Sequence, residues 1–486
     1  MFVGRVEQLE QLMGLWRVPV SSLVTCRGRR RIGKSTLIAE FARRSRARFV
    51  KLEGLPPQSN VDNAQQLDAF AHQLAEQTGN AYEPLGSWFD AFARLDACLN
   101  PKAKTIVLLD EISWMGKYDP GFSGQLKYAW DNRFSLKSKL IVVLCGSVSS
   151  WIDKHILKSK GFVGRPSLNL IVPELSLNEC YEFWRRGAGG ANISTRDVID
   201  LLSVTGGVPK YLERIDTGAT ADQNIERLCF RSGGVLVDEF EELFDDALDE
   251  NQAVRKQILL TLASGTMSVS ELAQANGLGL NGHVSENLAA LEASGFITKD
   301  EGLNPLSGKT AKEVRYRICD NYTRFYLKYI EPNRGLIKKG SFRFSSVEQL
   351  PGWNTILGLQ FESLVCNNVR QIMSAIGLDN MLLLSAAPYR QNQTVRTGKC
   401  QIDLLLQTRH THYLVEIKRR DRIGEEIVAE VRERMAKLKV KRGVNVIPVL
   451  VYAGELSKRV PADGFFSRIV SAEELLGADR KEFPRS

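Results

Sequence analysis

The segment Gly28-Arg29-Arg30-Arg31-Ile32-Gly33-Lys34-Ser35 constrains this chain more than any other, because it fits the pattern G-x-x-x-x-G-K-[ST]. An apolar stretch at 23–26 precedes it and a helical pattern at 36–42 follows it. Glycines let backbone N–H groups turn toward an anion, and the first turn of a helix presents further free N–H groups. The pattern therefore predicts a loop that cradles the phosphates of a nucleotide, with ATP as the expected ligand.

Each residue type in this loop has an expected task. We expect Lys34 to reach the β- and γ-phosphates and the Ser35 hydroxyl to bind Mg²⁺. The remaining residues would surround the phosphates with backbone N–H groups and positive charge. The predicted nucleotide-binding residues of the loop and the helix after it are Gly28, Arg29, Arg30, Arg31, Ile32, Gly33, Lys34, Ser35 and Thr36.

Strand and helix patterns alternate from about residue 20 to about residue 172. The expected strands are 23–26, 48–53, 105–109, 140–145 and 168–172, and the expected helices are 63–77, 88–99 and 121–132. Several of these strands are continuous apolar runs, as buried parallel strands are. The pattern predicts an α/β fold built on a doubly wound parallel sheet, in which ligands bind at the carboxyl ends of the strands.

Two of these strands end in polar residues. The strand at 105–109 leads into Asp110 and Glu111, which suits Asp110 to a metal ion and Glu111 to a base or a water-orienting group. The strand at 140–145 leads into Ser147, which either hydrogen-bonds the γ-phosphate or water, or lies at an ordinary strand exit. Further along, Arg165 either stabilises transition-state charge or is a surface arginine.

Composition excludes several other classes of protein. The 486 residues carry a net charge of +9, so polyanionic partners are plausible. The eight cysteines include no C-x-x-C pair, and the five histidines show no metal-binding spacing. The longest apolar run, at 140–145, is too short to cross a bilayer, and no signal segment is evident. We expect a cytoplasmic protein that has no contact with a membrane.

The middle of the chain has a different pattern. Helical patterns at 254–264, at 271–276 and in a third segment ending at 294 precede two short strands, at 296–298 and 314–318. Three helices and a hairpin predict a winged helix-turn-helix. The third helix contains no Lys or Arg between 283 and 292, so contact with a protein is at least as plausible as reading of DNA bases.

Basic and aromatic residues gather in the wing and after it. This mixture suits binding to a nucleic-acid backbone, whereas the aromatic spacing also fits one buried face of a helix. The basic residues are Lys309, Lys312, Arg315, Arg317, Arg324, Lys328, Arg334, Lys338, Lys339 and Arg343. The aromatic residues are Tyr322, Phe325, Tyr326 and Tyr329.

The C-terminal region contains a second candidate site on a hairpin of two apolar strands, 401–407 and 412–418. A turn centred between Arg409 and His410 would place Asp403 directly opposite Glu416, where two carboxylates can share a divalent metal. Lys418 lies two residues after Glu416 and so on the same face of the strand. It could position or deprotonate water, or neutralise a phosphate.

The N-terminal motifs resemble the archaeal-type P-loop ATPases, which are related to the STAND and AAA+ groups. The matching segments are Phe2–Arg5 with Glu7, Gly28–Ser35, Asp110–Trp114, Cys145–Ser147 and Gly206–Pro209, and Tyr316–Tyr322 continues the likeness. The resemblance implies adenine-side roles for Arg5 and Pro209. It also implies a sensor role for Ser147 and a γ-phosphate role for Arg165, acting within one chain or on a neighbouring copy.

The C-terminal hairpin resembles the core of the PD-(D/E)XK nucleases, D…E-x-K. Nucleases of this kind often add a glutamate from a preceding helix, a place that Glu362 fits, so the full set would be Glu362, Asp403, Glu416 and Lys418. Asp403 and Glu416 would hold Mg²⁺ or Mn²⁺. A salt-bridged hairpin without catalysis is the alternative, and the basic run at 418–420 and the helix at 425–437 could flank DNA.

These patterns predict four regions. They are an ATPase core at 1–176, a helical lid at 177–250, a winged helix-turn-helix at 251–345 and a nuclease-like domain at 346–486. The leading hypothesis is an ATPase that controls a metal-dependent, DNA-processing domain. The alternative is a non-nuclease switch ATPase that binds DNA or a protein partner, the latter through the winged helix. Either protein could form a homo-oligomer.

Overall fold

The computed structural model describes residues 2–58, 61–100, 103–147, 149–187, 193–247, 251–279, 282–311, 313–393 and 398–477. The chain forms two compact units, Met1–Glu174 and Leu175–Ser486, and each is described here by itself. The first boundary lies within two residues of the predicted end of the ATPase core. The finer division of the second unit into three domains stays a prediction.

The first unit is built on a five-stranded parallel sheet in the order β2-β3-β4-β1-β5. Its strands are β1 (Ser22–Arg27), β2 (Arg48–Glu53), β3 (Thr105–Asp110), β4 (Leu140–Gly146) and β5 (Pro166–Ile171). Every residue of β3 and β4 is buried, whereas burial alternates with exposure along the edge strand β5. The continuous apolar runs therefore occupy the middle of the sheet, as buried parallel strands do.

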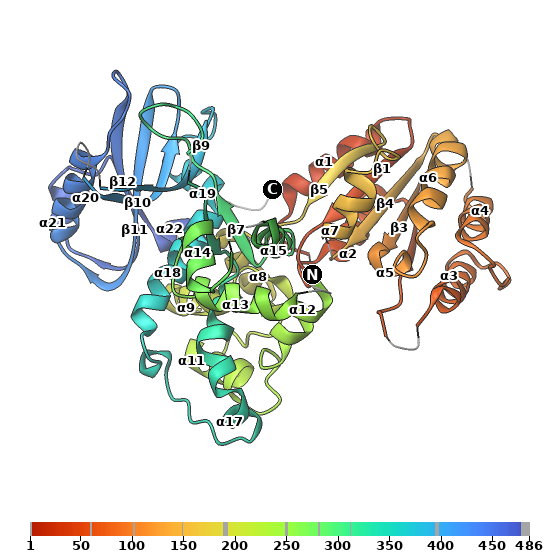
Figure 1. The fold of residues 1–486 in the computed structure, drawn as a ribbon, viewed down its shortest axis with the longest axis horizontal. Helices are drawn as coiled ribbons and strands as arrows, with labels where there is room; N and C mark the ends of the chain where they lie inside the picture. Colours follow the sequence, from red (N-terminus) through yellow and green to blue (C-terminus); the bar gives the residue numbers. More distant parts are fainter. Residues whose placement is uncertain are drawn as a thin grey trace. The chain divides into compact units, whose positions relative to one another are not determined.

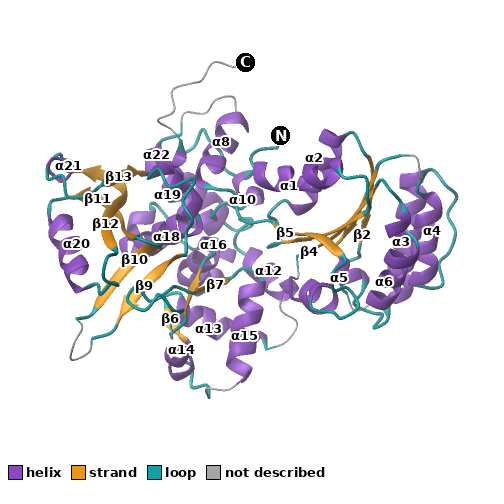
Figure 2. Ribbon diagram, turned by 90° about the horizontal axis from the view of Figure 1, so that it is seen from above, coloured by secondary structure: helices purple, strands orange, loops and turns teal. Residues whose placement is uncertain are grey.

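Helices cover both faces of this sheet, as Figures 1 and 2 show. One face carries α1 (Val6–Arg17) and α2 (Lys34–Ser45). The other carries α3 (Asn63–Thr78), α4 (Trp88–Cys98) and α6 (Phe122–Asn132), whose aromatic residues pack in one cluster against the sheet. The short helices α5 (Ile112–Met115) and α7 (Ser149–Ile152) follow β3 and β4. The predicted α/β architecture is confirmed.

The second unit begins with a group of helices. They are α8 (Leu177–Gly187), α9 (Thr195–Thr205), α10 (Pro209–Leu212), α11 (Ala221–Ile225) and α12 (Glu239–Ala247). Ser194 caps α9 by accepting a hydrogen bond from the Asp197 N–H, and Pro209 occupies the first turn of α10. Both features are favoured starts for a helix, because the cap satisfies a free N–H group and proline has none to leave unpaired.

Three helices and a small antiparallel sheet come next. The helices are α13 (Gln252–Leu262), α14 (Val269–Ala275) and α15 (Gly282–Ala293), and the sheet has the order β6 (Met267–Ser268), β8 (Arg315–Ile318), β7 (Ile297–Asp300). Ser268 and Glu271 form the capping box that the sequence predicts at the start of α14. All of the helices and strands expected here are present, within a few residues of their predicted ends.

The rest of the unit packs helices against a second five-stranded sheet, in the order β13-β12-β11-β10-β9 (Figure 1). Its strands are β9 (Ser385–Gln391), β10 (Cys400–Gln407), β11 (Thr411–Ile423), β12 (Asn445–Leu456) and β13 (Arg468–Ser471). The pairs from β9 to β11 are antiparallel, and those from β11 to β13 are parallel. The helices are α16 (Asn321–Phe325), α17 (Arg334–Lys338), α18 (Trp353–Asn367), α19 (Val369–Ala375), α20 (Glu426–Lys437), α21 (Arg459–Ala462) and α22 (Ala472–Leu476).

Two of these helices lie against the strands of the C-terminal hairpin. Helix α18 packs on β11, and α20 contacts both β10 and β11. Residues of α20 join the apolar cluster that also contains Ile402, Leu405 and Leu414 of the hairpin. Within the part of the chain that the structure describes, no helix is long and apolar enough to cross a membrane.

Candidate functional sites

The Gly28–Ser35 loop joins the carboxyl end of β1 to the first turn of α2, and its backbone suits the binding of an anion. Gly33 has a φ of 86° and Arg31 a φ of 68°, so the chain turns through the left-handed region at both. At Gly28 a Cβ atom would lie 2.5 Å from the Val172 carbonyl oxygen. Only glycine fits there, which explains why the loop pattern begins with this residue.

Polar side chains of the loop meet those at the end of β3. The Lys34 ammonium group is buried and donates to the carbonyl oxygens of Gly28 and Arg29, at 3.0 and 3.1 Å. The Ser35 hydroxyl donates to Asp110 Oδ2 at 2.6 Å. A hydroxyl and a carboxylate in contact are the oxygen donors that Mg²⁺ takes beside nucleotide phosphates, so these two residues fit such an ion.

Glu111 and Ser147 also lie together. The backbone N–H and the hydroxyl of Ser147 donate to Glu111 Oε2, at 3.1 and 2.9 Å. Burial raises the pKa of Glu111 above its ordinary value, although nearby Lys34 and the two Ser147 hydrogen bonds oppose the shift. A held carboxylate with a raised pKa suits the acceptance of a proton from water. The roles of both residues in hydrolysis stay predictions.

Several arginine side chains form contacts that support the loop. The buried Arg5 guanidinium donates to the carbonyl oxygen of Ile32 at 3.1 Å and to that of Glu174 at 3.3 Å. Arg29 pairs with the Glu174 carboxylate at 3.6 Å, and Arg30 lies over the ring of Trp114. The structure thus shows Arg5 supporting the loop, whereas its adenine-side role stays a prediction, as does that of Pro209, which belongs to the second unit.

Arg165 does not join this group. It precedes β5, whose first residue, Pro166, pairs with Leu23, whereas the loop follows the other end of β1. Six residues of strand span roughly 20 Å, so Arg165 lies at the amino edge of the sheet, away from the loop. There it forms a bidentate ion pair with Asp131, in which Nε and Nη2 donate to the two carboxylate oxygens at 2.6 and 2.9 Å. The geometry contradicts a γ-phosphate contact within one chain, and action on a neighbouring copy stays a prediction.

The C-terminal hairpin has the predicted register. Leu404 pairs with Val415, so the next position along the two strands brings Asp403 beside Glu416. The Ile417 N–H donates to Asp403 Oδ2 at 3.0 Å, which fixes the carboxylate against β11. Burial, together with the nearby carboxylates of Glu416 and Glu362, raises the pKa of Asp403 to about 8. Three acidic groups are therefore close enough to affect one another.

Two cations already contact Glu416, which is fully buried. Lys418 Nζ lies 2.7 Å from Oε1, and the Arg434 guanidinium of α20 donates to Oε2. Lys418 also lies 3.7 Å from Glu430 of α20. A buried carboxylate needs such partners, and this arrangement suits both the nuclease-like and the salt-bridged interpretation.

Glu362 lies on α18, in a buried cluster of opposite charges. Burial raises its pKa even though Arg317, Arg324 and Arg390 pull it down. Arg317 pairs with Asp300 at 3.1 Å and, like Arg324, is buried. Both arginines are therefore engaged inside the protein, which contradicts their assignment to a nucleic-acid surface.

The aromatic residues of segment 322–329 are buried, which decides between the two interpretations of their spacing. Tyr322, Phe325, Tyr326 and Tyr329 are all at most 2 % exposed. The hydroxyl of Tyr322 donates to the Leu236 carbonyl oxygen, and that of Tyr326 donates to Glu241. They form a buried helix face and not a stacking surface for bases. Lys312 lies outside the described residues.

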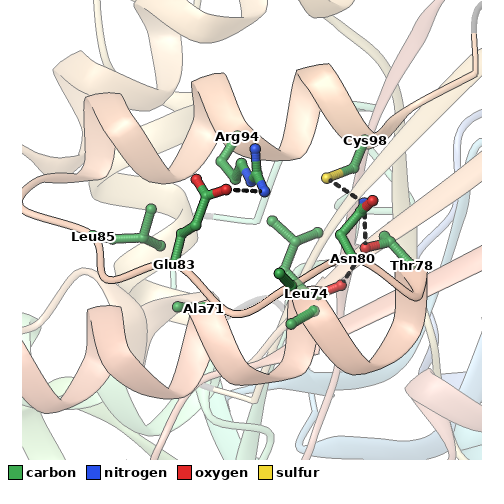
Figure 3. A pocket seen from close by; sticks show the side chains of 10 residues that line it. Ala71, Leu74, Thr78, Asn80, Glu83, Leu85, Arg94 and Cys98 are labelled. Carbon is green, nitrogen blue, oxygen red and sulfur yellow. Dashed lines mark hydrogen bonds and ion pairs between the residues drawn. The ribbon is translucent and has the colours of Figure 1, made fainter.

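Among the described residues, no group of three or more His, Cys, Asp and Glu side chains is arranged to hold a metal ion. A small pocket between α3 and α4 is lined by residues such as Leu74, Asn80 and Arg94, as Figure 3 shows. Arg94 pairs there with Glu83 at 2.5 Å. None of the predicted site residues lines this pocket.

Sequence reasoning missed several partners of the two sites. Lys51 of β2 lies 3.2 Å from Asp110 Oδ2, and Glu53 pairs with Asp110 in the sheet register. The signal was available, because β2 also ends in charged residues at the carboxyl edge of the sheet. Arg434 of α20 is a partner of Glu416 that only the packing of α20 on the hairpin reveals.

The parallel sheet, the loop after β1 and the carboxylates after β3 give the first unit the architecture of a P-loop ATPase. No protein-family model matches the sequence. An uncharacterized protein of Methanocaldococcus jannaschii, MJECL04, is 24% identical over 370 residues, which cover 74% of this chain and 76% of that protein.

Solved structures give weaker likenesses. The Walker-type ATPase PABY2304 of Pyrococcus abyssi is 17% identical with a TM-score of 0.49, covering 67% of this chain and 96% of its own. The ORC2 protein of Aeropyrum pernix is 15% identical with a TM-score of 0.41, covering 69% of this chain and 95% of its own. Likenesses at this level assign neither a family nor a function to the chain.

Proposed function

We propose that the protein binds and hydrolyses ATP in its first unit and uses the nucleotide to control a metal-dependent nuclease-like site in its second. One observation carries the proposal: the chain gathers two separate sets of residues suited to phosphate chemistry. The first is Lys34, Ser35, Asp110, Glu111 and Ser147. The second is Glu362, Asp403, Glu416 and Lys418.

At the first site the chain's own groups account for binding and for proton transfer. The loop N–H groups and Lys34 would hold the phosphates, and Ser35 with Asp110 would hold Mg²⁺, which neutralises phosphate charge when bound. Glu111, fixed by Ser147, would orient the attacking water and accept its proton. Arg5 keeps the loop in place through Ile32.

At the second site the carboxylates fit a divalent cation held by few protein ligands. Mg²⁺ is usually bound through one or two carboxylates together with substrate phosphates and water. Asp403 and Glu416 lie side by side and would hold it, and it would supply charge neutralisation at a phosphate. Burial and the neighbouring carboxylates raise the pKa of Asp403, so a bound cation would favour its ionised form. Lys418 would position water or neutralise developing charge.

The substrate class proposed for this site is nucleic acid, and the three-helix segment with its small sheet would be a winged helix-turn-helix. Helix α15 exposes His283, Ser285 and Glu286 and contains no Lys or Arg. Contact with a protein therefore suits it at least as well as reading of bases. Binding to a DNA backbone would depend on the exposed lysines Lys309 and Lys339 and on the surface of α20.

A second candidate function is a switch ATPase without nuclease activity. The ion pairs of Glu416 with Lys418 and Arg434 favour it, because they neutralise the carboxylate without a metal. In this case the second unit would only bind DNA or a protein partner.

Incubation with plasmid or branched DNA and Mg²⁺ or Mn²⁺ separates the two functions. The nuclease proposal expects wild-type protein to cleave the DNA, Lys418→Ala to abolish cleavage, and Lys139→Ala to retain it. Lys139 is a suitable control because it is an exposed lysine of the first unit and belongs to neither proposed site. Equal absence of cleavage in wild type and Lys418→Ala would reject the nuclease and leave the switch.

A further inference from the structure

Arg419, the residue directly after Lys418, points away from the candidate nuclease site. Successive residues of a strand face opposite sides of the sheet, so Lys418 lies with Glu416 on one side and Arg419 lies on the other. The Arg419 guanidinium reaches Asp200 of α9, with Nη2 3.5 Å from Oδ1. Their side chains are only 7% and 9% exposed, so this ion pair is shielded from water.

This contact occurs where β11 loses its regular pairing. The ladder between β11 and β12 shifts register between Arg419 and Arg422. At Gly454 of β12 a Cβ atom would lie 1.8 Å from the Arg420 carbonyl oxygen, so the two strands approach very closely at the shift. Arg419 is therefore the last paired residue of β11 before the shift, and Asp200 is the buried group that contacts it.

Helix α9 also anchors the helix that carries Glu362. The Gln360 side-chain amide donates to the Ser203 carbonyl oxygen at 2.8 Å and to that of Asn321, also at 2.8 Å. The Asn321 amide in turn donates to the carbonyl oxygens of Leu202 and Gln360, both at 3.2 Å. Gln360 is fully buried and lies two residues before Glu362.

Helix α9 thus contacts both β11, which carries Lys418, and α18, which carries Glu362. Asp200 holds β11 at the residue after Lys418, and Ser203 holds α18 close to Glu362. Loss of either contact would let Lys418 and Glu362 move relative to each other. Displacements of about 1 Å in a catalytic group are enough to slow a reaction about 100-fold.

We infer that Asp200 is a positioning residue of the C-terminal site, acting through Arg419 to hold Lys418 in place relative to Glu362. The inference rests on the proposed nuclease function for its catalytic consequence. Helix α9 belongs to the predicted lid region. A movement of α9 would therefore be transmitted to the C-terminal site through the contact between Asp200 and Arg419.

The variant Asp200→Asn tests the inference, because it keeps the size of the side chain and removes the charge that Arg419 faces. Metal-dependent cleavage should show kcat lowered by about 10- to 100-fold, with KM for DNA changed less than about twofold, since binding surfaces are untouched. Asp200→Glu should recover part of the lost kcat. A higher KM for DNA with an unchanged kcat would overturn the positioning role.

The matched control is Asp463→Asn, which breaks the exposed Arg432–Asp463 pair of the same unit, at 2.9 Å. It removes an Asp–Arg contact that has no connection with Lys418, so kcat should stay at the wild-type value. An equal loss in both variants would show a general effect of weakened packing and would reject the inference.

Hydrogen exchange provides a readout that does not depend on cleavage. In Asp200→Asn the amides of residues 415–419 should exchange about tenfold faster than in wild type and in Asp463→Asn, because β11 has lost its anchor at Arg419. Unchanged exchange there would overturn the inference, whatever the activity. If wild-type protein cleaves no DNA, the proposed nuclease fails, and the exchange rates still decide whether Asp200 anchors β11. Should Asp200→Asn fail to fold, Arg419→Lys replaces it in both measurements.

Discussion

The two candidate sites hold their carboxylates in different ways. In the first unit Asp110 and Glu111 accept hydrogen bonds from Ser35 and Ser147, and Lys34 lies beside a loop of backbone N–H groups. In the second unit Asp403 and Glu416 are buried, Glu362 lies near enough to affect Asp403, and the pKa of Asp403 rises to about 8. The carboxylates of the first site are therefore held by hydroxyl donors, whereas burial and neighbouring carboxylates disfavour ionisation of Asp403 in the second.

This difference predicts which site tolerates change. The first loop is held mainly through its backbone carbonyl oxygens, and the carboxylates beside it accept from serine hydroxyls, so variants there should affect ligand binding and hydrolysis more than folding. A cluster of buried charges depends on every partner, so variants there should affect stability and activity together.

Removal of the loop lysine should have the largest effect. Lys34→Ala deletes the cation that lies within the loop, so ATP affinity and hydrolysis should each fall about 100-fold or more, with little change in thermal stability. Equilibrium binding of a fluorescent ATP analogue and phosphate release measure the two effects. Lys139→Ala, at an exposed lysine of the same unit, should behave as wild type. Wild-type ATP affinity in Lys34→Ala would show that the loop does not bind the nucleotide.

Glu111→Gln should separate hydrolysis from binding. The amide keeps the size of the side chain but cannot accept a proton, so kcat should fall by about 10² to 10⁴ while the Kd for ATP stays within about threefold. Single-turnover hydrolysis and equilibrium binding report the two quantities. Glu76→Gln on the exposed face of α3 serves as the control. A parallel loss of binding would mean that Glu111 is structural.

Asp200 should leave a signature in the pH dependence of stability. Burial raises its pKa from 3.8 to about 6, although Arg419 and Arg196 oppose the shift and Asp197 adds to it. The folded protein then keeps a proton that the unfolded chain loses. The contribution of Asp200 to the free energy of unfolding is therefore largest below pH 4, decreases as the pH rises through 6, and is constant above it.

Urea unfolding between pH 4 and 7 can detect this change. The free energy of unfolding of wild type relative to Asp200→Asn should fall by up to about 3 kcal/mol over this range. The difference between wild type and Asp463→Asn should not follow the same course. A flat difference for Asp200 would show that its carboxyl titrates normally, as an exposed group does.

The smallest effect is expected at Arg165. Because this residue lies at the amino edge of the sheet and pairs with Asp131, Arg165→Ala should change kcat for ATP less than about twofold in dilute protein. A large loss of hydrolysis that grows with protein concentration would instead show that Arg165 acts on a neighbouring copy. A large loss that is independent of concentration would contradict the placement of Arg165 itself.

The sequence predicted most of the regular structure, because buried parallel strands and hairpins have a direct signal. The apolar runs at 105–109 and 140–145 became the fully buried β3 and β4. The register that joins Asp403 to Glu416 followed from the period of two along a strand and from the centre of the turn. The loop pattern fixed its own position between β1 and α2.

The positions of several arginines depended on the direction of a strand or on packing between residues that are far apart in the sequence. A residue directly before a parallel strand must lie at the amino edge of the sheet, so the position of Arg165 could have been deduced from the predicted strand that follows it. The burial of Arg317, Arg324 and Arg419 could not, because each meets its partner through tertiary packing. A basic residue in a sequence gives charge and no information about exposure.

The central claim is that nucleotide in the first unit controls chemistry in the second, and DNA cleavage with and without ATP tests it most directly. In the presence of Mg²⁺ or Mn²⁺, ATP should change the cleavage rate of wild-type protein by about fivefold or more. Lys34→Ala should cleave at one rate under both conditions, because it no longer binds the nucleotide. The claim is contradicted if ATP leaves the wild-type rate unchanged, or if Lys34→Ala responds to ATP as strongly as wild type.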